Sequence, residues 1–141
     1  MKLKNTDDLQ QELMNSPNLH EFLSDNQDHF SCESAAEMLN RLFSRENITK
    51  ATLAKRSGMS EVYLHQIFAG RRNPSRNRLL CLCYGLNASL DETQELLKRC
   101  GLAQLFPKIR RDVIIIYGLI HCISLFEIND KLFEEHEETL F

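Results

Sequence analysis

The sequence predicts an all-α protein, because apolar residues recur at helical spacing along most of its 141 residues. Ser or Thr stands before several of these segments and glycine stands after several, as at the ends of helices. Alternation of apolar and polar residues, which marks a half-buried strand, is nearly absent. With 43% hydrophobic residues the chain can bury one core, so we expect one compact domain with appended helices.

Residues 1–30 are predicted to form an acidic N-terminal arm of two short helices. Thr6 is placed to cap the first helix, ahead of two aspartates. Ser16 is placed to cap the second, with Pro17 at its first helical position. The arm carries two Lys against six Asp or Glu, which gives a net charge of −4.

Residues 31–104 are predicted to contain five further helices. The predicted N-caps are Thr49, Ser60, Ser75 and Ser89, whose side chains can accept from free backbone N–H groups. Gly58 closes one helix, because glycine adopts the left-handed conformation at little cost. The predicted helices cover residues 31–45, 49–57, 61–69, 75–85 and 89–101.

Residues 105–141 are predicted to form a C-terminal helical extension. Residues 113–117 are rich in β-forming side chains, so a buried strand is the alternative there. Because no other segment offers a partner strand, we expect a helix, apolar on all sides and covered by other helices or by a second subunit. His121 is expected to be a hydrogen-bonded core residue. One last amphipathic helix is expected in residues 127–141.

Composition and motifs exclude several classes of protein. The five cysteines, Cys32, Cys81, Cys83, Cys100 and Cys122, lie among apolar residues without a C-x-x-C pair, so we expect reduced core thiols and no metal site. No phosphate-binding glycine loop or hydrolase motif occurs, so we expect neither enzymatic activity nor a cofactor. No apolar run reaches ~18 residues, and the polar first residues lack a signal-peptide centre, so we expect a cytoplasmic protein without a membrane partner.

The net charge of −3 hides a basic middle region. Residues 45–80 carry eight Lys or Arg against Glu46 and Glu61, a net charge of +6, whereas residues 126–141 carry −5. A concentrated positive charge of this kind indicates a surface for an acidic partner.

Within that basic region, residues 49–69 have the spacing of a helix-turn-helix: helix 49–57, turn 58–60 and second helix 61–69. Ala54 has to be small because the second helix crosses it. Gly58 has to take a positive φ, and Leu64 has to fill the angle between the helices.

The stretch "ITKATLAKRSGMSEVYLHQIFAGRRNPSRNRLLCLCYGL" resembles the phage-repressor or Xre/Cro-like family of helix-turn-helix DNA-binding proteins. The resemblance covers roughly residues 35–97. It implies a lambda-repressor-like domain of five helices, here with additional helices at both ends, and binding to double-stranded DNA. The chain departs from the family pattern before Gly70, where the family often has an acidic residue and this chain has Phe68 and Ala69.

In such a domain the second helix enters the major groove, which is about 12 Å wide, and its outward residues face the base edges. The residues expected to contact bases are Glu61, Val62, Tyr63, His65 and Gln66. The residues expected to contact the DNA backbone are Lys50, Thr52, Arg71, Arg72, Asn73, Ser75 and Arg76. Gln66 fits the donor and acceptor of adenine. Glu61 has an alternative role as a first-turn carboxylate on the helix dipole, and Tyr63 as a packing residue.

The primary hypothesis is therefore a sequence-specific transcriptional regulator that binds an inverted repeat as a homodimer, with half-sites roughly 10 bp apart. The apolar residues 105–133 are the expected dimer surface. The alternative is a protein-interaction module, or an antitoxin-like partner protein, that uses the same fold and binds a protein through its C-terminal region.

Overall fold

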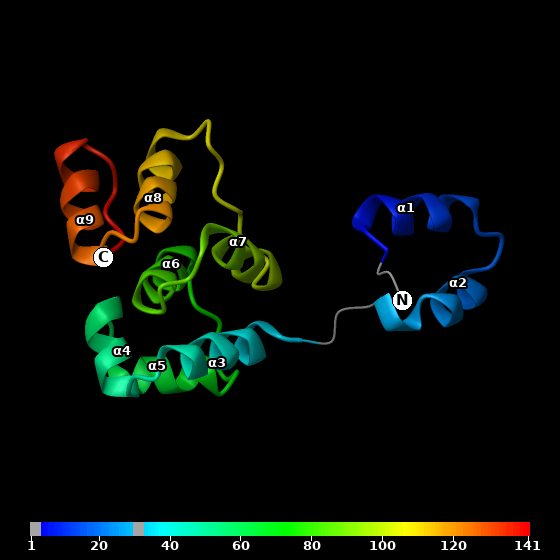
Figure 1. The fold of residues 1–141 in the computed structure, drawn as a ribbon, viewed down its shortest axis with the longest axis horizontal. Helices are drawn as coiled ribbons and strands as arrows, with labels where there is room; N and C mark the ends of the chain where they lie inside the picture. Colours follow the sequence, from blue (N-terminus) through cyan, green and yellow to red (C-terminus); the bar gives the residue numbers. More distant parts are fainter. Residues whose placement is uncertain (1–3, 30–32) are drawn as a thin grey trace. The chain divides into compact units, whose positions relative to one another are not determined.

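The computed structural model describes residues 4–29 and 33–141 (Figure 1). In this part of the chain it contains nine α-helices, one short 3₁₀ turn and no strand, which confirms the all-α prediction. The chain divides into two compact units, Met1–Glu33 and Ser34–Phe141.

The first unit contains α1 (Thr6–Asn15), α2 (Leu19–Asp25) and the 3₁₀ turn Gln27–His29. The side chain of Asn5 accepts from the backbone N–H of Asp8, whose carboxylate accepts in turn from the backbone N–H of Asn5. This reciprocal box satisfies two free donors. The N-cap of α1 is therefore Asn5, and the prediction of a cap at Thr6 is wrong by one residue.

The prediction that Ser16 caps α2 is also wrong. Ser16 ends α1, and its hydroxyl donates to the carbonyl oxygen of Asn18 at 3.1 Å. Asn18 is the residue that caps α2, since its side chain accepts from the backbone N–H of Glu21. Pro17 thus lies in the connection between the helices and not at the first helical position.

The second unit contains α3 (Ala35–Glu46), α4 (Lys50–Ser57), α5 (Glu61–Phe68), α6 (Arg76–Gly85), α7 (Leu90–Arg99), α8 (Arg110–Ile120) and α9 (Leu125–Glu134). The N-cap side chains that accept a backbone N–H are Ser34, Thr49, Ser60, Ser75, Ser89 and Ser124. The four caps predicted for this region are confirmed. The first helix begins at Ala35 because Ser34 caps it, and the predicted start at Ser31 lies outside the described residues.

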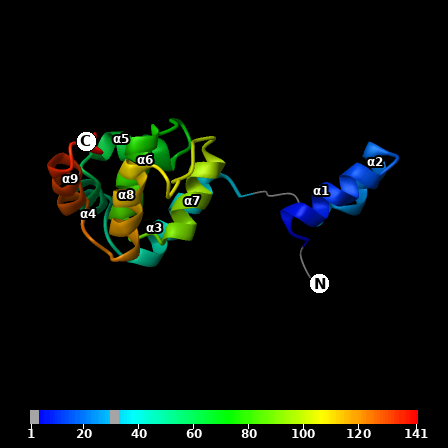
Figure 2. The same cartoon turned by 90° about the horizontal axis from the view of Figure 1, so that it is seen from above.

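The second unit is built around α6. Every residue from Leu79 to Gly85 is buried, and α4, α7 and α9 pack against this helix (Figures 1 and 2). A helix that is covered all round has no need of a polar face, which explains the apolar run in its sequence. On the other side of the unit, α3 packs against α5 and α7.

The apolar segment predicted as a helix is α8, and the alternative of a strand does not occur in it. Its inward side is buried, but other helices of this unit do not cover the opposite side, where Val113, Tyr117 and Ile120 are 44%, 50% and 56% exposed. Cover by a second subunit, the other alternative, stays a prediction. His121 is exposed as well, with its ring centroid 4.3 Å from that of Tyr117, so it is not the predicted core histidine. Within the second unit, the described residues leave this side of α8 exposed.

The C-terminal helices are integral to the second unit. A Cβ atom at Gly118 would lie 2.3 Å from Tyr84 Oη and 2.4 Å from Ile128 Cγ1, so only glycine allows α8 to approach α6 and α9 this closely. Tyr84 Oη donates to the carbonyl oxygen of Ile115 at 2.7 Å. Leu140 is buried in the same core. The expected boundary between residues 104 and 105 therefore separates two segments of one compact unit.

The cysteines differ in their burial. Cys81, Cys83, Cys100 and Cys122 are free thiols, as predicted, while Cys32 lies outside the described residues. Burial raises the pKa of Cys81 to about 11 and that of Cys83 to about 12. Cys122 was expected in the core but is exposed in the turn after α8, where its φ is 54°.

We expect iodoacetamide to alkylate Cys122 in the native protein and to leave Cys81 and Cys83 unmodified until urea unfolds the chain. The thiolate is the nucleophile, and burial keeps these two thiols protonated and inaccessible at neutral pH. Peptide mapping by mass spectrometry after timed labelling measures each site separately. If Cys83 in the folded protein were labelled as fast as Cys122, the core around α6 would be accessible to iodoacetamide, which contradicts the prediction.

Candidate nucleic-acid interface

The turn between α4 and α5 sets the direction in which α5 projects. Gly58 has a φ of 63°, and its N–H bonds the carbonyl oxygens of Ala54 and Lys55. Ser60 then caps α5 with its hydroxyl. Leu64 and Ile67 are buried, so α5 is anchored by one side and its opposite side faces outward.

The outward side of α5 carries the residues predicted to contact bases. Glu61, Val62 and His65 are exposed, with Val62 70% exposed, whereas Tyr63 and Gln66 are partly buried. His65 Nε2 lies 3.7 Å from Glu61 Oε1, one helical turn away. The five side chains therefore lie on one short helix, which exposes three of them to solvent.

Tyr63 and Gln66 belong to a cluster with two arginines that follow α5. The guanidinium carbon of Arg72 lies 4.7 Å from the centroid of the Tyr63 ring, and that of Arg78 lies 5.4 Å from it. Arg72 Nη1 donates to Gln66 Oε1 at 3.3 Å. Both guanidiniums are within the range of cation–π attraction to the ring, which holds them beside α5.

At the start of α4, Lys50 lies on two aromatic rings. Its ammonium is 4.2 Å from the centroid of Phe68 and 5.1 Å from that of Phe43. Burial against these rings lowers the pKa of Lys50. Two residues further on, the Thr52 hydroxyl lies 3.0 Å from that of the cap Thr49.

The loop after α5 carries the remaining residues predicted at the DNA backbone. Arg71, Arg72 and Asn73 are exposed. The Ser75 hydroxyl oxygen accepts from the backbone N–H of Arg78 at 3.3 Å and so caps α6. The loop thus presents two arginines and an amide immediately beyond the end of α5.

Arg76 lies differently from the other predicted backbone contacts. Its guanidinium donates to the carbonyl oxygens of Ala103 and Gln104 at 2.9 and 3.2 Å and to the Asp112 carboxylate at 3.2 Å. Asp112 is 2% exposed and also accepts from the backbone N–H of Phe106 at 2.9 Å. Arg76 therefore ties the start of α6 to the loop before α8. The sequence signal for Asp112 is an acid that stands directly before the apolar run of residues 113–116.

A basin of about 450 Å³ lies beside the N-terminus of α5. Its lining comes from the end of α4, the turn, and the two helices α5 and α6: Ala54, Lys55, Gly58, Met59, Ser60, Tyr63 and Arg78. Two of these residues are cationic, and free N–H groups of the first turn of α5 lie nearby. The electrostatics of the basin therefore favour an anion.

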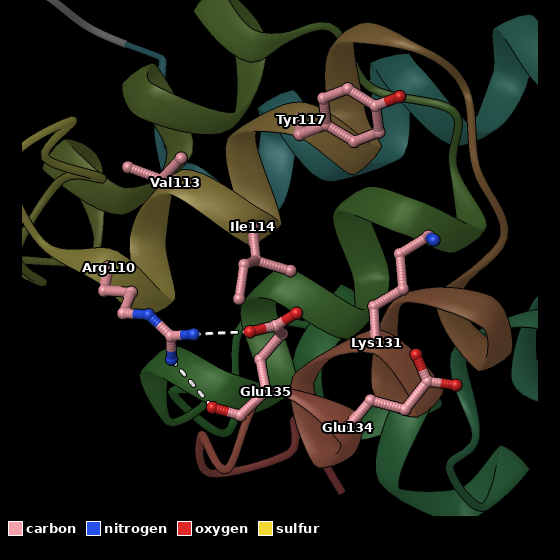
Figure 3. Close-up of a pocket in the computed structure, with 7 residues that line it drawn as sticks. All are labelled: Arg110, Val113, Ile114, Tyr117, Lys131, Glu134 and Glu135. Atoms are coloured by element: carbon pink, nitrogen blue, oxygen red, sulfur yellow. Dashed lines mark hydrogen bonds and ion pairs between the residues drawn. The ribbon is translucent and has the colours of Figure 1, made fainter.

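A second hollow, of about 380 Å³, lies between α8 and α9 (Figure 3). Val113, Ile114 and Tyr117 give it an apolar side, and the charged residues around it are Arg110, Lys131, Glu134 and Glu135. Arg110 pairs with the Glu135 carboxylate, donates to the Glu135 carbonyl oxygen at 2.7 Å and reaches Glu137 at 3.1 Å. The hollow thus combines an apolar surface with a rim that carries both positive and negative side chains.

Comparison with protein-family models agrees with the arrangement of α4, the turn and α5 described above. Residues 35–96 match a family model described as a helix-turn-helix domain, and this match runs from the start of α3 into α7. Searches of curated proteins and of solved structures found no match. Within residues 4–29 and 33–141, no helix combines the length and the apolarity that a bilayer crossing requires. Residues 35–96 are thus similar to a helix-turn-helix domain, and in this region the cationic residues Arg71 and Arg72 directly follow α5.

Proposed function

We propose that the protein is a sequence-specific DNA-binding transcriptional regulator that places α5 in the major groove. The observation that carries this proposal is the pairing of a solvent-facing α5 with the cationic loop Arg71–Arg72–Asn73 inside a helix-turn-helix domain. A helix that is anchored by one side can enter the groove with the other. Cationic side chains at its end neutralise phosphates, which supplies affinity for any DNA sequence.

The exposed residues of α5 divide into different kinds of base contact. Glu61 can accept from the amino group of cytosine, and Val62 can contact the methyl group of thymine. We propose that His65 contacts a base edge or a neighbouring phosphate. Gln66 contacts a base from the same side of the helix, and Tyr63 supports it.

The backbone contacts come from both sides of α5. We propose that Arg71 and Asn73 contact phosphates after α5, with Ser75 beside them. Before α5, Lys50 and Thr52 approach the backbone from the start of α4. Lys50 would reach a phosphate from its position on Phe43 and Phe68, where burial already costs its charge some hydration. Arg76 is not part of this set, because its guanidinium donates to the Asp112 carboxylate and to two carbonyl oxygens.

Salt dependence tests the proposed backbone contacts. We expect Arg71→Ala to weaken binding to specific and random DNA alike and to reduce the slope of log affinity against log salt by about 0.9, the value for one neutralised phosphate. The measurement is fluorescence anisotropy of a labelled duplex across a salt series. Lys98→Ala, which removes one exposed charge from α7, is the matched control and should leave the slope unchanged. Equal slopes for all three proteins would rule Arg71 out as a phosphate contact.

We further propose that the protein binds an inverted repeat as a homodimer through α8. Ile109, Val113, Tyr117 and Ile120 recur at helical spacing and are 44% to 56% exposed, which leaves an apolar stripe uncovered. A two-fold interface brings the same patch together twice and therefore needs a self-complementary rim. The rim beside the stripe carries cations and carboxylates side by side (Figure 3).

The same apolar stripe supports the second candidate function, a protein-interaction module or antitoxin-like protein. In that case a different protein covers α8, and the helix-turn-helix domain serves as a scaffold. One result distinguishes the two functions. A protein-interaction module would co-purify with its protein partner and would bind no DNA fragment at low salt. A cytoplasmic location is part of both proposals.

A further inference from the structure

We propose that Gln66 and Arg72 act together as one hydrogen-bond donor unit that selects guanine at one position of the half-site. This inference rests on the proposed function, since it concerns how α5 recognises DNA. It also assigns Arg72 to base recognition, whereas the sequence placed this residue at the DNA backbone.

Two contacts hold Arg72 against the outward side of α5. Its Nη1 donates to Gln66 Oε1 at 3.3 Å, and its guanidinium carbon lies 4.7 Å from the Tyr63 ring centroid. Tyr63 and Gln66 are three residues apart on the helix and therefore share a side. The ring is itself partly buried against the core, so it forms a fixed support for a side chain that would otherwise have many rotamers.

The hydrogen bond changes what Gln66 offers to a base. A free glutamine amide presents one acceptor and two donors, and an arginine presents five donors and no acceptor. When Gln66 Oε1 accepts from Arg72, the guanidinium stands beside the only acceptor of the pair. The donors that this bond leaves for a base are the amide NH₂ of Gln66 and the other N–H groups of Arg72.

Such a unit distinguishes the purines. In the major groove guanine presents two acceptors, N7 and O6, and each can take one hydrogen bond from the pair. Adenine presents N7 as an acceptor but N6 as a donor, which would face the guanidinium N–H groups. Gln66 alone would favour adenine, because its amide then supplies both the acceptor and the donor. The presence of Arg72 therefore reverses the preference expected from Gln66.

The test is selection of bound duplexes from a random library by four proteins: wild type, Gln66→Ala, Arg72→Ala and Arg71→Ala. The position at which Gln66→Ala loses preference identifies the base pair that faces Gln66. We expect guanine there for the wild type and adenine for Arg72→Ala, with a change in the guanine-to-adenine ratio between about fivefold and a hundredfold. Arg71→Ala is the matched control from the same loop, and it should retain guanine.

Two outcomes would overturn the inference and leave the proposed function in place. One is a specific operator without guanine at the Gln66 position. The other is an Arg72→Ala protein whose affinity falls equally for all sequences and which keeps the wild-type preference, since Arg72 would then be a phosphate contact. If the wild type enriches no sequence, the proposed function fails, and the inference fails with it.

A modified base provides a second measurement. Replacing that guanine by 7-deazaguanine removes the N7 acceptor, so wild-type affinity should fall, while the affinity of Arg72→Ala should change much less. Tyr63→Phe keeps the ring and should retain the guanine preference. Tyr63→Leu removes the ring and should give a preference between those of the wild type and Arg72→Ala. An unchanged preference in Tyr63→Leu would show that the ring does not hold Arg72.

Discussion

Replacing Asp112 with alanine is expected to lower the free energy of unfolding by about 3 kcal/mol. The carboxylate is 2% exposed and accepts both from the Arg76 guanidinium and from the backbone N–H of Phe106. Removing it leaves the Phe106 N–H without this acceptor and leaves the Arg76 charge without its carboxylate, in a partly desolvated site. The expected loss lies at the low end for a buried ion pair, because the side chain of Arg76 is 25% exposed and gains water. Urea unfolding followed by circular dichroism measures the change.

Asp130→Ala is the matched control, because Asp130 is an exposed carboxylate on α9. Its effect should stay within about 0.5 kcal/mol. Asp112→Asn keeps one acceptor oxygen and should fall between the two. A loss below 1 kcal/mol for Asp112→Ala would contradict this prediction. The contact between α6 and the loop before α8 would then not depend on the Arg76–Asp112 ion pair.

Tyr117→Asp is expected to convert the proposed dimer into a monomer. Tyr117 lies in the middle of the α8 stripe and is 50% exposed, so the fold of the single chain should tolerate a carboxylate there. Burying two such charges at a two-fold interface would be strongly unfavourable. Loss of the second half-site should lower affinity for the full operator by about 10²- to 10⁴-fold. Sedimentation equilibrium and titration of the operator measure the two effects.

Binding to a duplex with a single half-site gives the internal control, because Tyr117→Asp should bind it as the wild-type monomer does. Met14→Asp adds the same charge at an exposed apolar residue of the first unit. It should change neither the oligomeric mass in sedimentation nor the affinity for the operator. If Tyr117→Asp remains a dimer, α8 is not the dimer interface. If the wild-type protein is itself a monomer that binds a single half-site, the homodimer proposal is wrong.

Much of the second unit was predictable because its signals are local. A cap such as Thr49 or Ser60 acts on a backbone N–H three residues away, and Gly58 acts on its own φ. These effects do not depend on the rest of the fold. The first unit was predicted less well for the same reason: Asn5 competes with Thr6, and Asn18 with Ser16, among adjacent residues that can all cap a helix.

The exposure of α8 and the roles of two arginines were not predictable in the same way. An apolar sequence indicates burial but not what covers it, so cover of residues 113–117 by other helices and by a second subunit were both open, and His121 was expected in the core. Arg76 was assigned to DNA because it follows a basic loop, yet the contacts of its guanidinium are on residues 27 to 36 positions further along the chain. The bond between Arg72 and Gln66 depends in turn on how the loop after α5 folds back.

Selection of duplexes from a random DNA library by the wild-type protein at low salt tests whether α5 recognises a DNA sequence. We expect enrichment of an inverted repeat whose half-sites lie about 10 bp apart, centre to centre. We also expect Arg71→Ala to bind the enriched duplex more weakly. A library that shows no enriched sequence after repeated rounds would contradict the claim that α5 recognises DNA.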